Sequence, residues 1–508
     1  MTSTSRPSSH GPASQPLETS LRANLARLEQ AFGYPDNVDL HIRSLHIPAL
    51  RREAFLLYLE GVVDESTVEH HVLQPLLTSM QPLPEHEDRP ASLLLQRVLQ
   101  TASARIVTNT EDVVHDLLNG FAVLLIEFEC EAVSVNAPGF QARSVDIVQT
   151  ENVLLGPKEA FVESATINRS LVRKNLKEAS LITESITIGH EGRQIVHLMY
   201  LKTSADPELI QTVKQRIQSI ESTTVSQLSM LAQYMEDRPY SLLPTYLITE
   251  RPDRACAFLN EGHVVLIMES SPHALIAPVT FWSLFHTSED MYQRFFYGNF
   301  IRMIRLFSFF VALLTPALYI AITNYHVEMV PTDLVLAIGA TREKVPLPAI
   351  FEVLIMELTF ELLREAGIRI PSMIGPTIGI VGALILGQAA VDANIISPIL
   401  VIVVAITGLA SFTISDISFS FVIRITRFAI LASAAILGFF GMSLLLTVLI
   451  AYMVSVKSFG VPFLYPVAPY SRSANDTILR PTVWKLWLRP FQVRMQMAAK
   501  RSGGGNRT

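Results

Sequence analysis

Short segments of alternating apolar and polar residues fill the chain from about Leu21 to residue 299. Alternation, or a short apolar run between turn residues, is typical of β-strands. The expected strands are 37–47, 52–61, 105–110, 121–129, 182–189, 194–203, 263–268 and 274–277. Helical periodicity lies between them, in segments 66–77 (interrupted near Pro75), 92–100, 112–118, 164–177, 251–259 and a helix that begins at Pro207 behind an Asp206 cap. Strands alternating with helices predict an α/β fold.

The pattern restarts near residues 150–157, which divides this part into two subdomains. The first eighteen residues are rich in Ser and Pro and lack apolar periodicity, so we expect a disordered tail over 1–20. The two α/β subdomains are then expected at 21–150 and 151–299.

Beyond residue 300 the pattern changes to long uncharged apolar runs. A helix needs about 20 apolar residues to cross the hydrocarbon of a bilayer, and four runs come near that length. They are residues 306–324, 372–391, 393–415 and 428–456. The last run is long enough to span with tilt or with a break at Gly438 or Gly441. The fold class we expect is therefore α plus α/β, with a polytopic helical membrane domain over 300–456 and a tail over 457–508.

Small and polar residues mark the second and third runs. Close glycine spacing, including one GxxxG pair, lets helix backbones approach each other in lipid. The expected helix-packing residues are Gly375, Gly379, Gly382 and Gly387. The expected hinge residues are Pro316, Gln388, Asp392 and Asn394. A simple anchor hairpin is the alternative, but an anchor needs neither the glycines nor the polar joint.

Residues 351–367, between the first two runs, hold the candidate ion path. On a helix, Glu357, Glu361, Arg364 and Glu365 fall within about 100° of one another, and Glu352 points elsewhere. The i,i+3 spacing predicts that Arg364 pairs with Glu361, which leaves Glu357 as the least neutralised carboxylate. Copies of Glu357 in an oligomer would form an acidic ring that favours cations. An interfacial amphipathic helix with internal Glu–Arg pairing is the alternative.

Charge and hydropathy restrict the partners and the orientation. The formal net charge of −6 argues against nucleic acid as a partner. The mean hydropathy of +0.34 fits a chain that is part soluble and part membrane. No signal peptide is visible, Arg294, Arg302 and Arg305 precede the first run, and the tail is basic. The positive-inside rule then predicts both ends in the cytoplasm and four spans, a count that places Arg424 and Arg427 outside.

Catalytic and metal-binding patterns are missing from the sequence. It contains no phosphate-loop motif, no HExxH and no paired CxxC. His70 and His71 lie on a predicted helix without partner ligands, and Cys130 and Cys256 are too few for a disulfide framework. We therefore expect no enzyme, no metal site and no cofactor.

Six ordered blocks of sequence resemble one known family. They are GPKEAFVESATINRSLVRKNL (156–176), ERPDRACAFLNEGHVVLIM (250–268), SSPHALIAP (270–278), PALYIAITNYHVEMVPTDL (316–334), EVLIMELTFELLREAGIRIPSMIG (352–375) and SFGVPFLYPVAP (458–469). With the run 371–421, these blocks resemble the A subunit of GerA-type spore germination receptors. The chain departs from that pattern at Ser415, where the family usually has proline, and at Glu269-Ser270, where it tends to have Asp-Gly.

The resemblance implies a role in nutrient-triggered germination from the inner membrane of a bacterial spore, with both ends facing the spore core. It implies a transporter-like B subunit that senses the germinant, a lipoprotein C subunit, and homo-oligomers of the A subunit that conduct cations. Three alternatives stay open. They are an auxiliary family member encoded with dipicolinate-channel genes, a secondary transporter, which would favour inverted repeats that the spans lack, and a non-conducting scaffold.

Overall fold

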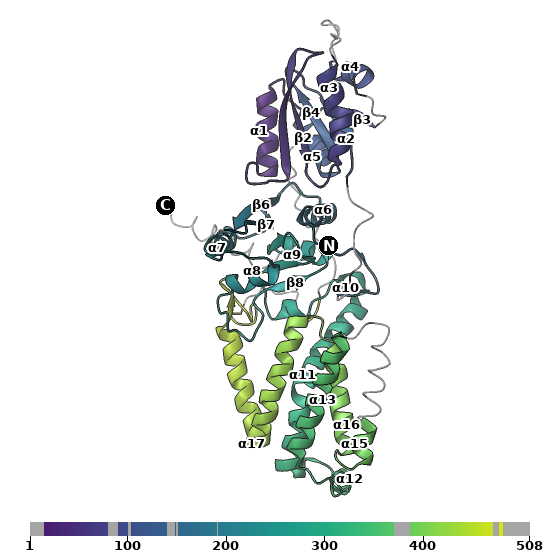
Figure 1. The fold of residues 1–508 in the computed structure, drawn as a ribbon, viewed down its shortest axis with the longest axis vertical. Helices are drawn as coiled ribbons and strands as arrows, with labels where there is room; N and C mark the ends of the chain where they lie inside the picture. The colour runs from purple at the N-terminus through teal and green to yellow at the C-terminus, as the bar shows by residue number, and fades with distance from the viewer. Residues whose placement is uncertain are drawn as a thin grey trace, which may run out of the picture. The chain divides into compact units, whose positions relative to one another are not determined.

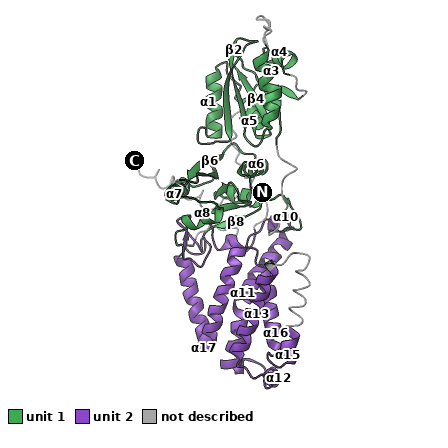
Figure 2. Ribbon diagram, viewed as in Figure 1, with its two compact units in different colours: residues 1–239, 246–278, 489–508 green, residues 240–245, 279–488 purple. Residues whose placement is uncertain are grey.

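The structure, a computed structural model, describes residues 15–79, 90–99, 103–139, 148, 151–189, 191–369, 387–470 and 477–480. The chain divides into two units (Figure 2). Unit 1 comprises residues 1–239, 246–278 and 489–508, and unit 2 comprises residues 240–245 and 279–488. Each unit has a hydrophobic core of its own.

The first sheet of unit 1 has five strands in the order β1-β2-β4-β5-β3, and every pairing between them is antiparallel. Its strands are β1 (Leu40–Ile47), β2 (Arg52–Leu59), β3 (Ala104–Val107), β4 (Phe121–Ile126) and β5 (Ala132–Asn136). Its helices are α1 (Leu21–Phe32), α2 (Glu65–Val68), the π-helix η1 (Glu69–Leu73), α3 (Gln74–Thr78), α4 (Pro90–Arg97) and α5 (Thr110–Leu118). These helices and strands occupy the upper part of Figure 1.

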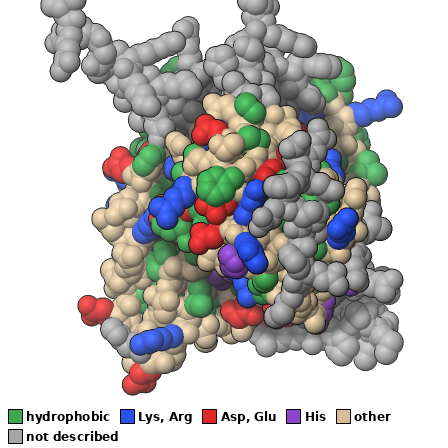
Figure 3. Space-filling model, turned by 90° about the horizontal axis from the view of Figure 1, so that it is seen from above, with side chains coloured by type: hydrophobic (Ala, Val, Ile, Leu, Met, Phe, Trp, Pro, Cys, Tyr) green, Lys and Arg blue, Asp and Glu red, His purple; other side chains and the backbone are tan. Residues whose placement is uncertain are grey.

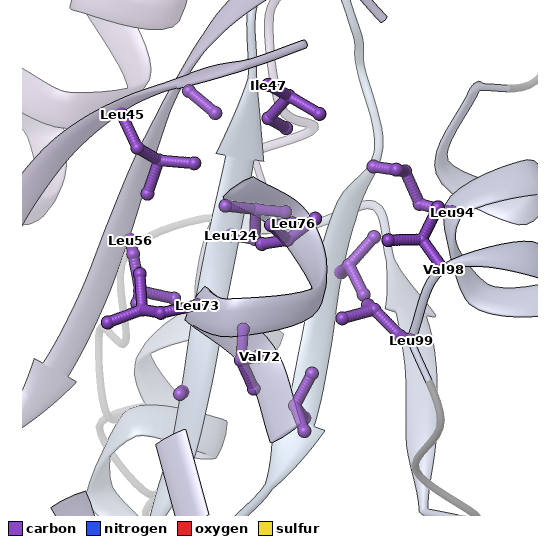
Figure 4. Packing of buried hydrophobic residues seen from close by; sticks show 14 of the residues in the cluster. Leu45, Ile47, Leu56, Val72, Leu73, Leu76, Leu94, Val98, Leu99 and Leu124 are labelled. Atoms are coloured by element: carbon purple, nitrogen blue, oxygen red, sulfur yellow. The ribbon is translucent and has the colours of Figure 1, made fainter. Parts of the chain in front are cut away.

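Alternation along the strands of this sheet supplies two cores, one on each face. In β4, Leu124 packs with the helices α3 and α4, whereas Val123 and Leu125 pack with α1 and α5. Figure 4 shows the first of these cores, where Leu73 and Leu76 of the helical segment lie over the sheet. A strand buried on both faces reads as a continuous apolar run, which is why the sequence over 121–129 predicts this strand.

The helix predicted at 66–77 continues past Pro75 by widening one turn. Proline has no backbone N–H and clashes with the preceding turn of an α-helix. The π-helix η1 comes directly before α3, which has Pro75 in its first turn. The expected interruption is therefore a π-turn between two short α-helices, not a gap in the helix.

The second sheet of unit 1 has the order β6-β7-β9-β10-β8 and is again antiparallel. Its strands are β6 (Leu181–Ile188), β7 (Gln194–Leu201), β8 (Leu247–Thr249), β9 (Val264–Met268) and β10 (Ala274–Ala277). Its helices are α6 (Ala165–Asn175), α7 (Pro207–Gln218), α8 (Leu228–Met235) and α9 (Pro252–Asn260). Asp206 caps α7, as expected, by accepting from the backbone N–H of Glu208.

The α/β prediction is wrong in the direction of the strands. Alternation of strands and helices along the chain suggests parallel βαβ units, but all pairings among the named strands of both sheets are antiparallel. Hairpins such as β1–β2 and β6–β7 need only short connections, and antiparallel pairs are the ones that such connections permit. Each subdomain is thus an α+β unit.

Four buried polar residues join the two sheets of unit 1. Asp39, just before β1, lies 2.5 Å from the Arg169 guanidinium and 2.5 Å from that of Arg173, both on α6. Thr183 of β6 donates its hydroxyl to the same carboxylate over 2.6 Å. Burial raises the pKa of Asp39, but the two guanidinium charges and the Thr183 hydroxyl outweigh it, so the pKa is lowered overall. Both arginines belong to the helix predicted at 164–177, and both are buried.

The turn at Glu269-Ser270 is one of the two places where the chain departs from the family pattern. Ser270 has φ 63°, in the left-handed region that favours glycine. Its N–H donates to the carbonyl of Glu163, and the Glu269 carboxylate accepts from the N–H of Ala165, both over 2.8 Å. The turn therefore holds the start of α6 in place, with serine where the family pattern has glycine.

Charged side chains of both signs are interspersed on the face of the molecule drawn in Figure 3. A mixed surface of this kind is ordinary for a soluble domain. No single-sign patch stands out among the described residues of that face.

Unit 2 is a set of helices that begins with short turns. The elements are η2 (Trp282–Phe285), α10 (Glu289–Tyr292), α11 (Phe295–Tyr325), η3 (Val327–Met329), α12 (Thr332–Arg342), α13 (Ala349–Arg369), α15 (Gly387–Asp392), α16 (Pro398–Phe412), α17 (Ile417–Ser455), β11 (Lys457–Ser458) and β12 (Val461–Pro462). Within the described residues, α11 and α17 are the two helices that are long and apolar enough to cross a membrane. α11 packs against α16 and α17, and a core that includes Ile320, Val353 and Leu400 lies among α11, α13 and α16.

The predicted spans agree with the observed helices to different extents. Residues 306–324 lie inside α11, which runs through Pro316 as one helix. Most of 372–391 is outside the described residues. The run 393–415 contains α16, but that helix begins only at Pro398, where the Ser397 hydroxyl accepts from the N–H of Leu400.

The run 428–456 is not one span, because α17 reverses at Gly438. Gly438 has φ 59° and ψ −139°, and the two arms, 417–437 and 439–455, form the V in Figure 1. Phe419 near one end of α17 and Met453 near the other line the same small apolar cavity, so the arms run back along each other. The break expected at Gly438 or Gly441 is therefore at Gly438, and it makes a helical hairpin.

Replacing Gly438 with alanine should lower the stability of unit 2 by about 1–3 kcal/mol, because this backbone conformation is essentially restricted to glycine. A Cβ there would also lie 3.0 Å from the Tyr325 side chain, whose hydroxyl donates to the carbonyls of Ala435 and Ile436. Thermal unfolding of the full chain in detergent measures the change. Gly339→Ala is the control, since nothing lies within 4 Å of its Cβ position. Equal unfolding midpoints for Gly438→Ala and wild type would contradict the prediction.

Candidate functional site

The acidic residues predicted on 351–367 face the inside of unit 2. Glu357 and Glu361 lie on the side of α13 that meets the first arm of α17. Arg427 is 2.7 Å from the Glu357 carboxylate and 2.9 Å from that of Glu361. Arg424 forms an ion pair with Glu361 as well. We call Glu357, Glu361, Arg424 and Arg427 the membrane charge cluster.

The opposite side of α13 is apolar and exposed. Its exposed side chains are Phe351, Leu354, Ile355, Leu358 and Leu362, at 36–63%. Glu357 and Arg427, in contrast, are 1% exposed each. The sequence pattern thus folds α13 with Glu357 and Glu361 toward α17 and with a row of apolar residues exposed, the reverse of a helix on a soluble surface.

Arg364 does not pair with Glu361, so the predicted i,i+3 pair is wrong. Its guanidinium donates to the Ser411 hydroxyl on α16. It also lies over the rings of Phe360 and Phe412, with distances of 5.1 and 4.7 Å to the ring centres. A pair within one helix is worth only a few tenths of a kcal/mol, and the arginines of α17 reach Glu361 from the neighbouring helix instead.

Among the described residues, Glu357 pairs with Arg427 alone, whereas Glu361 pairs with Arg424 and Arg427, so Glu357 is the less neutralised of the two. It nevertheless has a cation partner that the sequence did not indicate. The prediction takes account of basic neighbours only on the same helix, and Arg427 comes from 70 positions further along the chain. The four-span count places Arg424 and Arg427 outside, but both belong to the first arm of α17. Glu365 is exposed at the next turn of α13.

A second buried carboxylate, which the sequence did not predict, lies at the start of α13. Glu352 is 1% exposed, accepts from the N–H of Ser397 over 3.1 Å, and lies 3.7 Å from the Arg342 guanidinium. It therefore ties the end of α12 and the start of α16 to α13. The sequence places Glu352 on a different side of the helix from Glu357. That separation is the one feature of the sequence that indicates a different set of contacts for Glu352.

Of the four predicted helix-packing glycines, Gly387 is among the described residues. Gly375, Gly379 and Gly382 lie outside the described residues, so their packing role stays a prediction. Gly387 begins α15, and its nearest neighbour is a methyl group of Val401, 3.9 Å from its Cβ position.

The hinge candidates occupy three different settings. Pro316 is buried inside α11. Gln388 and Asp392 belong to α15, and Asn394 follows it with φ 55°, which asparagine tolerates better than most residues. Among the described residues, no group of three or more His, Cys, Asp or Glu side chains is placed to hold a metal ion.

Helices of membrane-spanning length, with ion pairs buried among them, indicate a membrane-associated protein that carries an α+β head. The profile of the Bacillus/Clostridium GerA spore germination protein family matches residues 26–492. The chain belongs to this family.

Three relatives of the chain are similar over most of its length, and two of them are named as spore germination proteins. It is 38% identical to the uncharacterized membrane protein YfkQ of Bacillus subtilis, over 86% of this chain and 84% of the relative. It is 33% identical to spore germination protein KA of the same organism, over 94% and 87% of the two chains. Spore germination protein A1 of B. subtilis is 35% identical, over 84% and 87%.

One solved structure is also similar. It is the crystal structure of the N-terminal domain of the A subunit of the Bacillus megaterium spore germinant receptor GerK3. The identity is 26%, and the match covers 53% of this chain and 98% of that one. The TM-score of 0.42 is too low for this likeness to bear on the fold.

Proposed function

We propose that this chain is the A subunit of a nutrient-responsive spore germination receptor, located in the inner membrane of the spore. In this proposal it works with a transporter-like B subunit and a lipoprotein C subunit. Copies of the chain assemble into a cation-conducting pore that opens when the partner senses a germinant. Membership of the GerA family supports the germination part of the proposal, and the apolar helices α11 and α17 support the membrane part.

The membrane charge cluster is the observation that carries the pore. Charged side chains at membrane depth cost a few kcal/mol on insertion scales, and such residues are found along ion and substrate pathways. Each carboxylate of the cluster is held by an arginine of α17. The paired arrangement is a closed state in this proposal, and movement of α17 would free Glu357 and Glu361 to attract cations.

Glu357→Gln should reduce the cation preference of the conducting oligomer, because it removes a charge and keeps the size of the side chain. The measurement is the reversal potential across a bilayer under a salt gradient, with the purified full chain, and we expect it to move toward zero. Glu343→Gln, on the exposed end of α12, is the matched control and should leave it unchanged. The same reversal potential for wild type and Glu357→Gln would remove this cluster as the selectivity element. A purified oligomer without conductance would favour a scaffold.

Both ends of the chain should face the spore core, as the basic tail and basic residues before α11 suggest. Cysteines introduced at Ser9 and Ser502 should resist an impermeant thiol reagent added outside intact membranes, and should react once the membrane is opened. Cys130 is exposed and is replaced by serine for this experiment. Labelling of only one of the two sites from outside would mean an odd number of crossings.

A further inference from the structure

An uninterrupted apolar band covers the exposed side of α11 over its first half. Every exposed side chain between Phe295 and Thr323 is apolar or tyrosine. We call these residues the aromatic band: Phe296, Tyr297, Phe300, Met303, Ile304, Phe307 and Phe310, which are 40–85% exposed. The first five precede the apolar run 306–324, in a part of the helix that the sequence placed outside the hydrocarbon.

The charges in this part of α11 are turned inward and paired. Arg302 lies 2.8 Å from the Asp290 carboxylate of α10, and Arg305 pairs with the same carboxylate. All three side chains are buried. The basic residues that suggest an aqueous location for this segment therefore present no charge to the surroundings of the helix.

The close fit of α10 on α11 fixes this inward arrangement. A Cβ at Gly298 would lie 2.9 Å from the backbone oxygen of Asp290. Asn299 donates to the carbonyl of Arg480 and accepts from its N–H, so a segment near the end of the chain is held at the same place. The inward face of α11 is thus occupied by protein, and the aromatic band is left on the other side.

The length of α11 identifies what covers the band. Its 31 residues extend about 46 Å at about 1.5 Å per residue. That length matches a whole bilayer with its headgroup regions, about 40–45 Å, and exceeds the hydrocarbon alone, about 30 Å. Arg294 lies directly before α11 and is exposed. It is the first exposed charged side chain on the N-terminal side of the aromatic band. A cation there suits the phosphates of a lipid surface.

We propose that α11 contacts lipid from Phe296 onward. Its first turn then lies at the level of the headgroups, with Arg294 among the phosphates, and the rest of the aromatic band lies in the acyl chains of the same leaflet. The embedded face then begins about ten residues before the start of the apolar run, a difference that follows from the internal pairing of Arg302 and Arg305 with Asp290. This inference needs a membrane-inserted chain but no pore, so it stands or falls separately from the reversal potential of Glu357→Gln.

The test places an environment-sensitive fluorophore on Phe300→Cys in the full chain, in phosphatidylethanolamine and phosphatidylglycerol vesicles. Cys130 and Cys256 are replaced beforehand. Phe307→Cys, two turns further along the same face and inside the apolar run, is the membrane control. Gln30→Cys, exposed on α1, is the water control. We expect quenching by nitroxide-labelled lipids at position 300 to match position 307, and aqueous iodide to quench only position 30.

Three outcomes would overturn the proposal. Iodide quenching at position 300 as strong as at position 30 would place the band in water. Protection from both quenchers, together with a disulfide between the Phe300→Cys side chains of two copies, would assign the band to a second copy of this chain. Protection from both without a cross-link would assign it to another protein surface. Met303→Cys repeats the measurement if Phe300→Cys fails to fold.

Discussion

Arg427→Leu should destabilise unit 2 by about 3–5 kcal/mol, the range for removing one partner of a buried ion pair. Arg427 is 1% exposed and serves two carboxylates, so its loss leaves Glu357 without a cation and Glu361 with Arg424 alone. The midpoint of thermal unfolding of the purified full chain in detergent should fall by several degrees. Lys344→Leu, which removes an exposed cation from the same unit, should change it little.

A second substitution separates lost charge pairing from lost packing. In the Arg427→Leu background, Glu357→Gln removes one stranded carboxylate and should recover part of the stability, because an uncharged buried group costs less than a charged one. Arg427→Lys keeps the charge and should lie between wild type and Arg427→Leu. An Arg427→Leu variant as stable as wild type would mean that the ion pairs contribute nothing to the fold.

Local patterns predicted part of the local structure of this chain, although α1, α8 and β5 were not expected from them. The alternation of residues 37–47 and the apolar run 121–129 became β1 and β4, and Asp206 caps α7 as the sequence indicated. Such features depend on neighbours a few positions away, which the sequence displays directly. Strand direction depends on which strands pair, and the alternation of strands with helices pointed to the wrong answer.

Contacts between distant residues account for what the sequence did not predict. Periodicity placed Glu357 and Glu361 on one side of α13, but it could not reveal which helix that side meets. Arg424 and Arg427 lie between the predicted runs 393–415 and 428–456, and nothing in the sequence indicated that they belong to the same helix as the second of these runs. The sequence therefore indicated Glu357 and Glu361 as residues of the membrane charge cluster, but it did not indicate which arginines pair with them.

The buried polar group around Asp39 went unnoticed for the same reason. Arg169 and Arg173 are four positions apart, so they share one side of α6. Their common partner lies 130 and 134 positions earlier. A single sequence does not show that these residues are in contact. The aspartate lies directly before a strand, and the two arginines lie on a helix of a later subdomain.

Asp39→Ala should therefore be the most damaging single change in unit 1, at about 3–5 kcal/mol. It strands two guanidinium groups that are 7% and 2% exposed and removes the acceptor of the Thr183 hydroxyl. Urea unfolding of the full chain at neutral pH measures the loss. Asp36→Asn, an exposed carboxylate three positions earlier, is the matched control and should be near neutral. An Asp39→Ala variant with the wild-type midpoint would contradict the expected role of this residue.

The contribution of Asp39 should also depend on pH in a predictable direction. Its pKa is lowered in the folded protein from the ordinary value of 3.8, so the folded state binds the proton less readily than the unfolded state. The stabilisation is therefore complete above about pH 3.8 and is lost as the pH falls from there through the folded pKa. The difference in unfolding free energy between wild type and Asp39→Asn should be constant from about pH 7 to about pH 5 and should shrink below about pH 3.8. A difference that grows on acidification would mean that Asp39 is held protonated in the folded state, and the two guanidinium partners would then need another counter-charge.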